Sequence, residues 1–218
     1  MMIQASVACF AKVFCFGDSL TSGSSPPFME SFPYGPHLEK EIRNLSGKQD
    51  TMVRWKGYPG WTASNLSQEG GLGAILDDIQ LKTGTHVDLV IILAGTNDLA
   101  YETNPDTIFN SIKAIHEIAH NRNIHTLALG VPDSAWQRQS AETAKVAGEV
   151  NMKLQEWSTA ISVPSDFEPF PIQTFDPSSG YWAPDGLHFS PQGYQYLGER
   201  VAPKVTTMLS NIHGQLMI

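Results

Sequence analysis

The sequence predicts an α/β fold in which a parallel sheet of five strands lies between two layers of helices. Two observations support this prediction: short apolar runs alternate five times with segments of helical periodicity, and polar turns follow most of these runs. The length of 218 residues suits a single domain that spans residues 1–218. Because parallel strands are joined by right-handed crossovers, helices should cover both faces of the sheet, which gives a three-layer α/β/α sandwich.

The N-terminal half supplies three of the expected strands. Residues 13–16 form a short apolar run ended by glycine, and the run at 87–93 is nearly continuous in apolar character, as in strands buried on both faces. Residues 51–55 are a weaker candidate. Between the strands, residues 36–45 begin with proline and have apolar residues at helical spacing, while residues 66–81 are mostly helical with a break at neighbouring glycines.

The C-terminal half alternates in the same way. The Asn-Pro pair at 104–105 suits the N-cap and first turn of a helix, and four isoleucines then mark one face of that helix. Residues 124–129 are the expected fourth strand, and a long helix follows from about Ser140. A short fifth strand is expected near residues 171–175, within a proline-rich stretch, and the Ser-Pro pair at 190–191 opens the last helix.

Composition and charge exclude several classes of function. The net charge is −8, whereas nucleic-acid binders carry basic patches, so we expect no nucleic-acid partner. The two cysteines, Cys9 and Cys15, lack the spacing of a metal site, and Cys15 is expected to be a small buried thiol. No apolar stretch is long enough to span a membrane. The first twelve residues lack the basic start of a signal peptide, so we expect a cytoplasmic protein unless the chain is the trimmed form of a secreted one.

Ser19 is the candidate nucleophile, because it follows the first predicted strand in a tight polar turn. A serine needs a base to take its proton, a carboxylate to orient that base and donors for the oxyanion. His188 is the candidate base, and Asp185, three residues earlier, can reach back to its ring. An Asp-x-x-His sequence can also be an ordinary surface cap of the last helix. The other six histidines have no comparable sequence context.

Three groups are candidates for the oxyanion hole. They are the side-chain amide of Asn97 and the backbone N–H groups of Gly60 and Ser19. Asn97 follows the third predicted strand and Gly60 follows the second, so both should lie near Ser19 at the carboxyl edge of the sheet. Each also has a purely structural interpretation: Asn97 as a partner for backbone groups, and Gly60 as part of a Pro-Gly turn.

Together these motifs resemble the SGNH hydrolases, also called GDSL esterases and lipases, over nearly the whole chain. The resemblance rests on Phe16-Gly17-Asp18-Ser19-Leu20-Thr21, Gly57-Tyr58-Pro59-Gly60-Trp61-Thr62, Gly95-Thr96-Asn97-Asp98 and Asp185-Gly186-Leu187-His188-Phe189. It implies a flavodoxin-like sheet with strand order 2-1-3-4-5. It also implies hydrolysis of carboxylic esters through an acyl-serine intermediate, with a Ser-His-Asp triad and an oxyanion hole but no metal or cofactor.

The substrate is expected to be a small-molecule ester with a short acyl group, acetyl first, because no long insertion is present that could cover a fatty chain. Aromatic residues crowd the predicted loops and indicate a partly apolar site. The candidates for its lining are Trp61, Tyr101, Trp182 and Leu187. A sugar, an aryl alcohol and a lysolipid all remain open as the alcohol, and the oligomeric state is open too.

Several alternatives share this fold. The same site could serve an acyltransferase, a lysophospholipase or a thioesterase, or the chain could be a silent binding module. A nucleotide or flavin binder would need a phosphate-cradling loop, which residues 21–25 imitate, but Pro26 and Pro27 disfavour a long helix within that loop. A glycosidase is weakly supported because no carboxylates are suggestively paired. Metal-dependent hydrolysis is weaker still, because His116 and His120 lack a third ligand.

Overall fold

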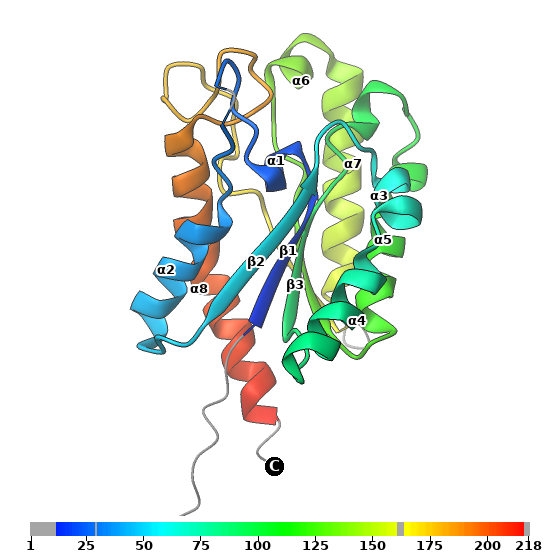
Figure 1. Ribbon diagram of the computed structural model, residues 1–218. Helices are drawn as coiled ribbons and strands as arrows, with labels where there is room; N and C mark the ends of the chain where they lie inside the picture. The colour runs from blue at the N-terminus through cyan, green and yellow to red at the C-terminus, as the bar shows by residue number, and fades with distance from the viewer. Residues whose placement is uncertain (1–11, 29, 161–163, 216–218) are drawn as a thin grey trace, which may run out of the picture.

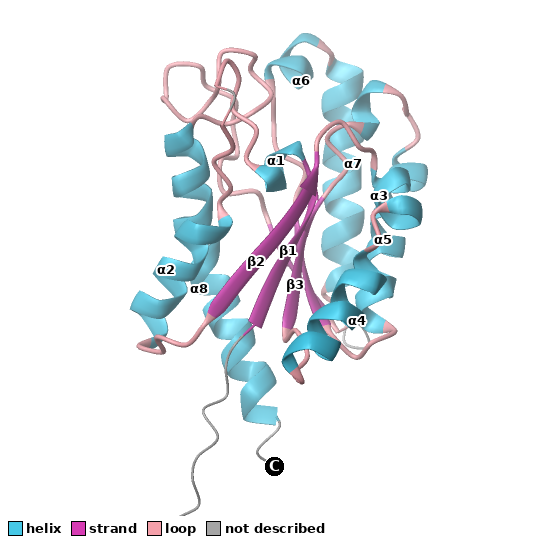
Figure 2. Cartoon of the chain, in the orientation of Figure 1, coloured by secondary structure: helices cyan, strands magenta, loops and turns pink. Residues whose placement is uncertain are grey.

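The sheet has five parallel strands in the order β2-β1-β3-β4-β5, with helices on both of its faces (Figure 1, Figure 2). The computed structural model describes residues 12–28, 30–160 and 164–215. The strands are β1 Lys12–Asp18, β2 Met52–Tyr58, β3 Leu89–Leu93, β4 His125–Leu129 and β5 Ser165–Glu168. This arrangement confirms the three-layer α/β/α fold and the strand order that the family resemblance implied.

The helices divide between the two faces of the sheet. One face, on the left in Figure 1, is covered by α2 Gly35–Ser46 and α8 Pro191–Gln215. The other is covered by α3 Ala63–Glu69, α4 Leu72–Thr83, α5 Pro105–His120 and α7 Ala141–Ser158. Three short helices lie in loops: α1 Ser19–Ser22, η1 Asp98–Ala100 and α6 Ala135–Gln139. The expected break at the paired glycines separates α3 from α4, because Gly71 adopts a left-handed conformation there.

Each face of the sheet has its own hydrophobic core, because successive strand residues point to opposite sides. Ile91 packs with Leu38 of α2 and Leu197 of α8, whereas its neighbour Val90 belongs to the core that includes Ile112 of α5. β3 is buried along its whole length, as its continuous apolar character predicted. Each fully buried side chain of this kind contributes about 1.5–3 kcal/mol, so the central strand is a rigid base for the loops beyond it.

The prediction of a fifth strand near residues 171–175 was wrong. β5 lies earlier, at Ser165–Glu168, and pairs with β4 through Thr126 opposite Ser165. Prolines lack the N–H that a sheet ladder requires, so the Pro-rich stretch after Glu168 leaves the sheet. Its apolar residues Phe170 and Ile172 pack into the core as loop residues instead. β5 was hard to find because only one of its four residues, Phe167, is apolar and buried.

Cys15 is a fully buried free thiol, and burial raises its pKa to about 12, which confirms its prediction as an inert core residue. Cys9 and the first eleven of the twelve residues considered as a possible signal peptide lie outside the described residues. Among the helices in the described part of the chain, none combines the length and apolar character needed to cross a bilayer.

Candidate active site

Ser19 begins α1 directly after the end of β1. The Asp18 side chain accepts a hydrogen bond of 2.9 Å from the Leu20 N–H and so caps this one-turn helix. At the start of a helix the backbone N–H of Ser19 needs no intrahelical acceptor, and it finds no other acceptor in the part of the chain that the structure describes, so it remains available to a ligand. Ser19 is only 6% exposed, so its hydroxyl lies in a confined position at the carboxyl edge of the sheet.

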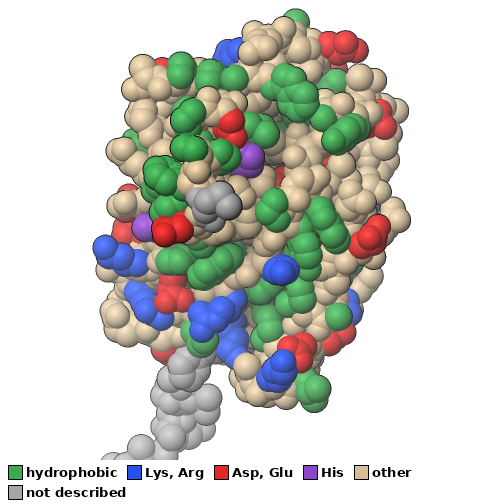
Figure 3. All heavy atoms as spheres, turned by 45° about the horizontal axis from the view of Figure 1, so that its top comes forward, with side chains coloured by type: hydrophobic (Ala, Val, Ile, Leu, Met, Phe, Trp, Pro, Cys, Tyr) green, Lys and Arg blue, Asp and Glu red, His purple; other side chains and the backbone are tan. Residues whose placement is uncertain are grey.

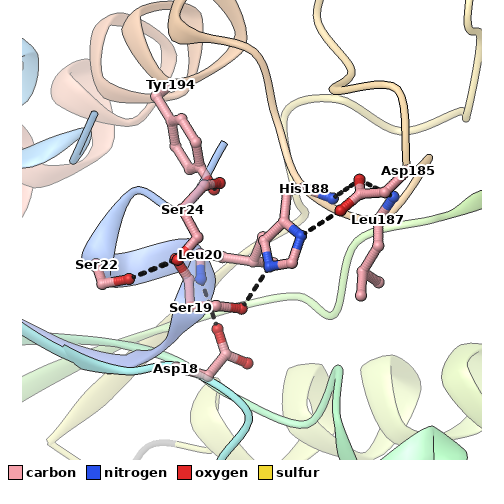
Figure 4. Close-up of polar contacts among 9 residues, drawn as sticks. All are labelled: Asp18, Ser19, Leu20, Ser22, Ser24, Asp185, Leu187, His188 and Tyr194. Atoms are coloured by element: carbon pink, nitrogen blue, oxygen red, sulfur yellow. Dashed lines mark hydrogen bonds and ion pairs between the residues drawn. The ribbon is translucent and has the colours of Figure 1, made fainter. Parts of the chain in front are cut away.

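His188 links Ser19 to Asp185 (Figure 4). Its Nε2 lies 2.9 Å from the Ser19 Oγ, and its Nδ1 lies 2.7 Å from the Asp185 Oδ2. A carboxylate at Nδ1 stabilises the tautomer with its proton there, so Nε2 presents a lone pair to the hydroxyl. The three side chains therefore form one continuous path from carboxylate to hydroxyl, which is the geometry that nucleophilic catalysis by serine requires.

The tight turn before His188 orients the side chains of both Asp185 and His188. The Asp185 Oδ1 accepts hydrogen bonds of 3.0 Å from the N–H groups of Leu187 and of His188. Burial alone would raise the pKa of Asp185, but the bonds from the His188 ring and from these two N–H groups outweigh it and leave the pKa lowered. Asp185 is therefore ionised at neutral pH, as its role beside the imidazole requires.

The two other candidate loops flank Ser19 because β1 lies between β2 and β3. In the sheet register, Asp18 is opposite Tyr58 and Gly17 is opposite Leu93, so the chain leaves all three strands at nearly the same level. The Asn97 Nδ2 donates a hydrogen bond of 2.9 Å to the Trp61 carbonyl oxygen. A carboxamide has two N–H donors, so the second remains for a ligand.

Gly60 lies in the same loop as Trp61, next to it in the chain. Its φ of +80° is a left-handed conformation, and a Cβ there would meet nothing within 4 Å, so the backbone rather than lack of space requires glycine. Within residues 12–28, 30–160 and 164–215, the Gly60 N–H has no protein acceptor. The Asp98 Oδ2 accepts a bond of 2.8 Å from the Ala63 N–H, which fixes the other end of the loop.

The sequence also matches a known protein family. The model of the GDSL-like lipase/acylhydrolase family matches residues 15–196, a span that begins in β1 and ends within α8. The chain belongs to this family. As a GDSL hydrolase it is a carboxylic ester hydrolase, which the motifs around Ser19, Asn97 and His188 had predicted. No curated protein sequence is significantly similar to it.

Solved structures share the fold of this GDSL hydrolase at low sequence identity. An acetyl esterase variant with acetate ion has a TM-score of 0.67 and 18% identity, over 93% of this chain and 100% of the esterase. A lipase/acylhydrolase from Enterococcus faecalis has a TM-score of 0.66 and 24% identity, over 91% and 96% of the two chains. A carbohydrate esterase family 3 protein from Talaromyces cellulolyticus has a TM-score of 0.66 and 19% identity, over 93% and 99%.

Two buried carboxyl groups stand beside the catalytic residues of the GDSL hydrolase. Asp18 is fully buried, and this burial raises its pKa to about 7. The hydrogen bond from the Leu20 N–H lowers the pKa in part, whereas the charge of Asp98 raises it further. Burial is also the main reason why the pKa of Asp98 is raised. Each accepts a hydrogen bond from a backbone N–H, of Leu20 and of Ala63. Both therefore brace loops, and the path between Ser19 and Asp185 includes neither.

The four candidates for substrate contact lie in different environments. Trp61 is half-buried and stacks on Tyr58 with ring centroids 4.5 Å apart, while Tyr101 is 82% exposed at the end of η1. Leu187 lines a pocket of about 310 Å³ beside the triad. Trp182 is only 7% exposed, because its ring packs against Phe175 and Phe189. Its burial leaves little of the indole for a substrate, so it supports the loop that carries the triad instead.

α6 forms the other wall of that pocket and was not among the helices predicted from the sequence. Trp136 and Gln139 on this helix line the pocket together with Asp185, Gly186 and Leu187. The available signal was Ser134, a good N-cap, whose hydroxyl accepts a hydrogen bond from the Gln137 N–H. The helix is too short to show a periodic apolar face, which is why the pattern analysis missed it.

His116 and His120 lie in a polar cluster at the opposite end of β4 from the triad. The His116 Nδ1 and the His120 Nε2 lie 2.7 Å and 2.9 Å from the Thr126 Oγ1, and that hydroxyl in turn bonds Ser165. Among the residues that the structure describes, no three His, Cys, Asp or Glu side chains are grouped to hold a metal ion. These hydrogen bonds give both histidines a structural role, although the buried His116 Nε2 has no hydrogen-bond partner among the described residues.

Proposed function

We propose that this GDSL hydrolase is a serine esterase that removes short acyl groups, acetyl first, through an acyl-serine intermediate. The single observation that carries the proposal is the unbroken hydrogen-bonded path from Asp185 through His188 to Ser19. The last two residues are 169 positions apart in the chain, so this contact is not a local consequence of the sequence.

The steps of the reaction can be described by the position of one proton, which moves between Ser19, His188 and the departing alcohol. The His188 Nε2 takes the proton of Ser19 while the Oγ attacks the ester carbonyl carbon, and Asp185 stabilises the imidazolium that results. The negative charge on the carbonyl oxygen is balanced by the Asn97 amide and the N–H groups of Gly60 and Ser19. The imidazolium then donates its proton to the departing alkoxide, which leaves as the alcohol. Water repeats the sequence on the acyl-serine and releases the acid.

Two features favour a small acyl group. The Trp61 ring is stacked on Tyr58 and the Asn97 amide is bonded to the Trp61 backbone, so the loop on the oxyanion side is held in one position, and the chain has no long insertion to cover a fatty acyl chain. The structural neighbours also include an acetyl esterase with acetate ion and two family 3 carbohydrate esterases. These similarities support acetyl as the acyl group of choice.

A series of p-nitrophenyl esters with two to twelve acyl carbons tests this proposal. We expect kcat/KM to be highest for acetate and to fall steadily with chain length, and a serine-directed fluorophosphonate to stop turnover. Ser19→Ala should leave only background hydrolysis of the acetate while the variant keeps the far-ultraviolet circular dichroism of the parent. Full activity in Ser19→Ala would refute the acyl-serine mechanism, and a maximum at long chains would refute the acyl assignment.

A further inference from the structure

We propose that the pocket between α6 and the Asp185–Leu187 turn is the subsite for the alcohol part of the ester, and that it takes a pyranose ring. This inference rests on the ester hydrolysis proposed above. The pocket has a volume of about 310 Å³ and is lined by Ala135, Trp136, Gln139, Asp185, Gly186 and Leu187. That volume is at the lower end of the range for small-molecule sites, so it suits one ring rather than an extended chain.

The position of the pocket matches the path of the departing alcohol. The alkoxide oxygen must lie within hydrogen-bond reach of the His188 Nε2, because that atom returns the proton. The oxyanion donors come from the loops after β2 and β3, whereas His188 comes from the loop before α8. Leu187 immediately precedes the base, borders the pocket and lies on the Asp185 side of the imidazole (Figure 4). Nε2 faces Ser19, on the other side of the ring from Asp185, so an alcohol bonded to Nε2 reaches the pocket by extending past the Leu187 side chain toward α6.

The two walls of the pocket are held together by the backbone. The Ala135 N–H donates a hydrogen bond of 2.9 Å to the Gly186 carbonyl oxygen, which joins the start of α6 to the turn that carries the triad. Gly186 has a φ of +67°, and a Cβ there would approach the Ala135 Cβ to 2.6 Å, so only glycine allows this contact. Because α6 is fixed to the turn, a ring held on α6 keeps its distance from the reacting atoms.

The lining has the chemistry that recognises a sugar. Trp136 is 45% exposed, and among the described residues its indole is paired with no other aromatic ring. An indole face packs against the C–H face of a pyranose, as an apolar platform with a polar edge. Gln139 is exposed, and within the described ranges its carboxamide makes no hydrogen bond to protein. It can both donate to and accept from a sugar hydroxyl.

The other two tryptophans near the triad are less suitable. One ring face of Trp61 is occupied by Tyr58, and Trp182 is buried among Phe175 and Phe189. Hydrophobic side chains are spread over this end of the molecule in Figure 3, which brings the carboxyl edge of the sheet forward. Apolar surface is therefore widespread at this end of the molecule. α6 differs because it places beside the triad an indole without an aromatic partner and a carboxamide without a hydrogen bond, as judged over the described residues.

The test keeps the acyl group constant and varies the alcohol. The substrates are a mono-acetylated methyl xylopyranoside, phenyl acetate and ethyl acetate. We expect Trp136→Ala to lower kcat/KM for the glycoside ester about tenfold, mainly through KM, and to change ethyl acetate less than twofold. Trp136→Phe should recover most of the loss. Gln139→Ala should lower kcat/KM for the glycoside ester and leave phenyl acetate unchanged.

The matched control is Leu81→Ala, which removes an 84% exposed side chain on α4 that lies away from the triad. This variant should have the parent kcat/KM on all three substrates. An equal loss on the glycoside ester and ethyl acetate would mean that Trp136 only supports the triad turn, and would overturn the proposal. No loss of kcat/KM in Trp136→Ala on any substrate would also overturn the proposal. So would a loss on phenyl acetate in Trp136→Ala together with no effect of Gln139→Ala, because that pattern would indicate a site for aryl alcohols.

A binding experiment separates this inference from the proposed reaction. In Ser19→Ala, methyl xylopyranoside should shift the indole N–H resonance that Trp136→Phe removes. A shift in Ser19→Ala, together with a parent protein that hydrolyses none of the esters, would support the sugar subsite and refute the proposed function. Active hydrolysis of esters with no shift up to the solubility limit of the glycoside would refute the subsite alone.

Discussion

The Asn97 side chain donates a hydrogen bond to the Trp61 carbonyl oxygen across the end of the sheet and joins the loop after β3 to the loop after β2. The contact orients the carboxamide before any substrate arrives, and it leaves the second N–H available, as the proposed oxyanion hole requires. Preorganised donors of this kind stabilise a developing charge without reorganisation at the moment of reaction.

Replacing Asn97 by alanine should therefore slow the chemical step. We expect kcat on p-nitrophenyl acetate to fall about 10²–10³-fold, with a smaller change in KM, since the donor acts on charge that develops only in the transition state. Asn44→Ala is the control, because Glu41 is the only hydrogen-bond partner of that exposed amide on α2 among the residues that the structure describes. A kcat within threefold of the parent for Asn97→Ala would show that the oxyanion is stabilised elsewhere.

Asp185→Asn tests the carboxylate of the proposed triad with little change of shape. The new carboxamide oxygen can still accept the two N–H bonds from Leu187 and His188, so the turn should persist. His188 loses the negative charge beside Nδ1, and we expect kcat to fall about 10⁴-fold. Steady-state kinetics measures the loss, and an unchanged thermal midpoint shows that the fold survives. More than a tenth of the parent kcat would contradict the assignment.

Asp18 should make the protein less stable as the pH rises from about 4 to about 7. The pKa of its carboxyl is 3.8 in the unfolded chain and about 7 in the folded one, so the native state binds more protons throughout this window. Stability is then highest near the acid end and levels off above pH 7. Urea unfolding at a series of pH values should show this slope.

The slope should be smaller in Asp18→Asn, which keeps an acceptor for the Leu20 N–H but cannot ionise. Some slope will remain, because burial also raises the pKa of Asp98. Glu69→Gln, at an exposed position at the end of α3, should leave the parent slope unchanged. A slope in Asp18→Asn equal to that of the parent would show that Asp18 is ionised in the folded state.

Thr126→Val should destabilise the fold without affecting catalysis. The change leaves the His116 Nδ1 and the His120 Nε2 without their shared partner in a buried cluster, which should cost about 1–3 kcal/mol of unfolding free energy. The kcat should not change, because the cluster lies at the far end of β4. Thr206→Val, whose hydroxyl bonds only a carbonyl within α8, is the control for urea unfolding. An unchanged stability together with a lower kcat would contradict this structural role.

Much of the fold and site could be predicted from the chain because its strongest signals are local. β3 is a continuous apolar run, and α5 has an Asn-Pro start and an isoleucine face. Each is stabilised by burying its apolar residues, whichever segment packs against them. The polar motif around Ser19 follows a strand directly, so the topology of a parallel sheet brings it to the carboxyl edge. There its partners from the other motifs also gather.

Other features depend on contacts between distant segments and have no local signal. β5 has one buried apolar residue and forms because β4 offers an unpaired edge. Trp182 stands in a loop, yet Phe175 and Phe189 bury its ring, and the pocket exists because the Ala135 N–H meets the Gly186 carbonyl. The raised pKa of Asp18 likewise arises from burial against neighbours that are remote in the chain. Periodicity and local motifs indicate the secondary structure that each segment favours. The burial of a side chain and the pairing of a strand depend instead on which distant segments the fold brings next to it.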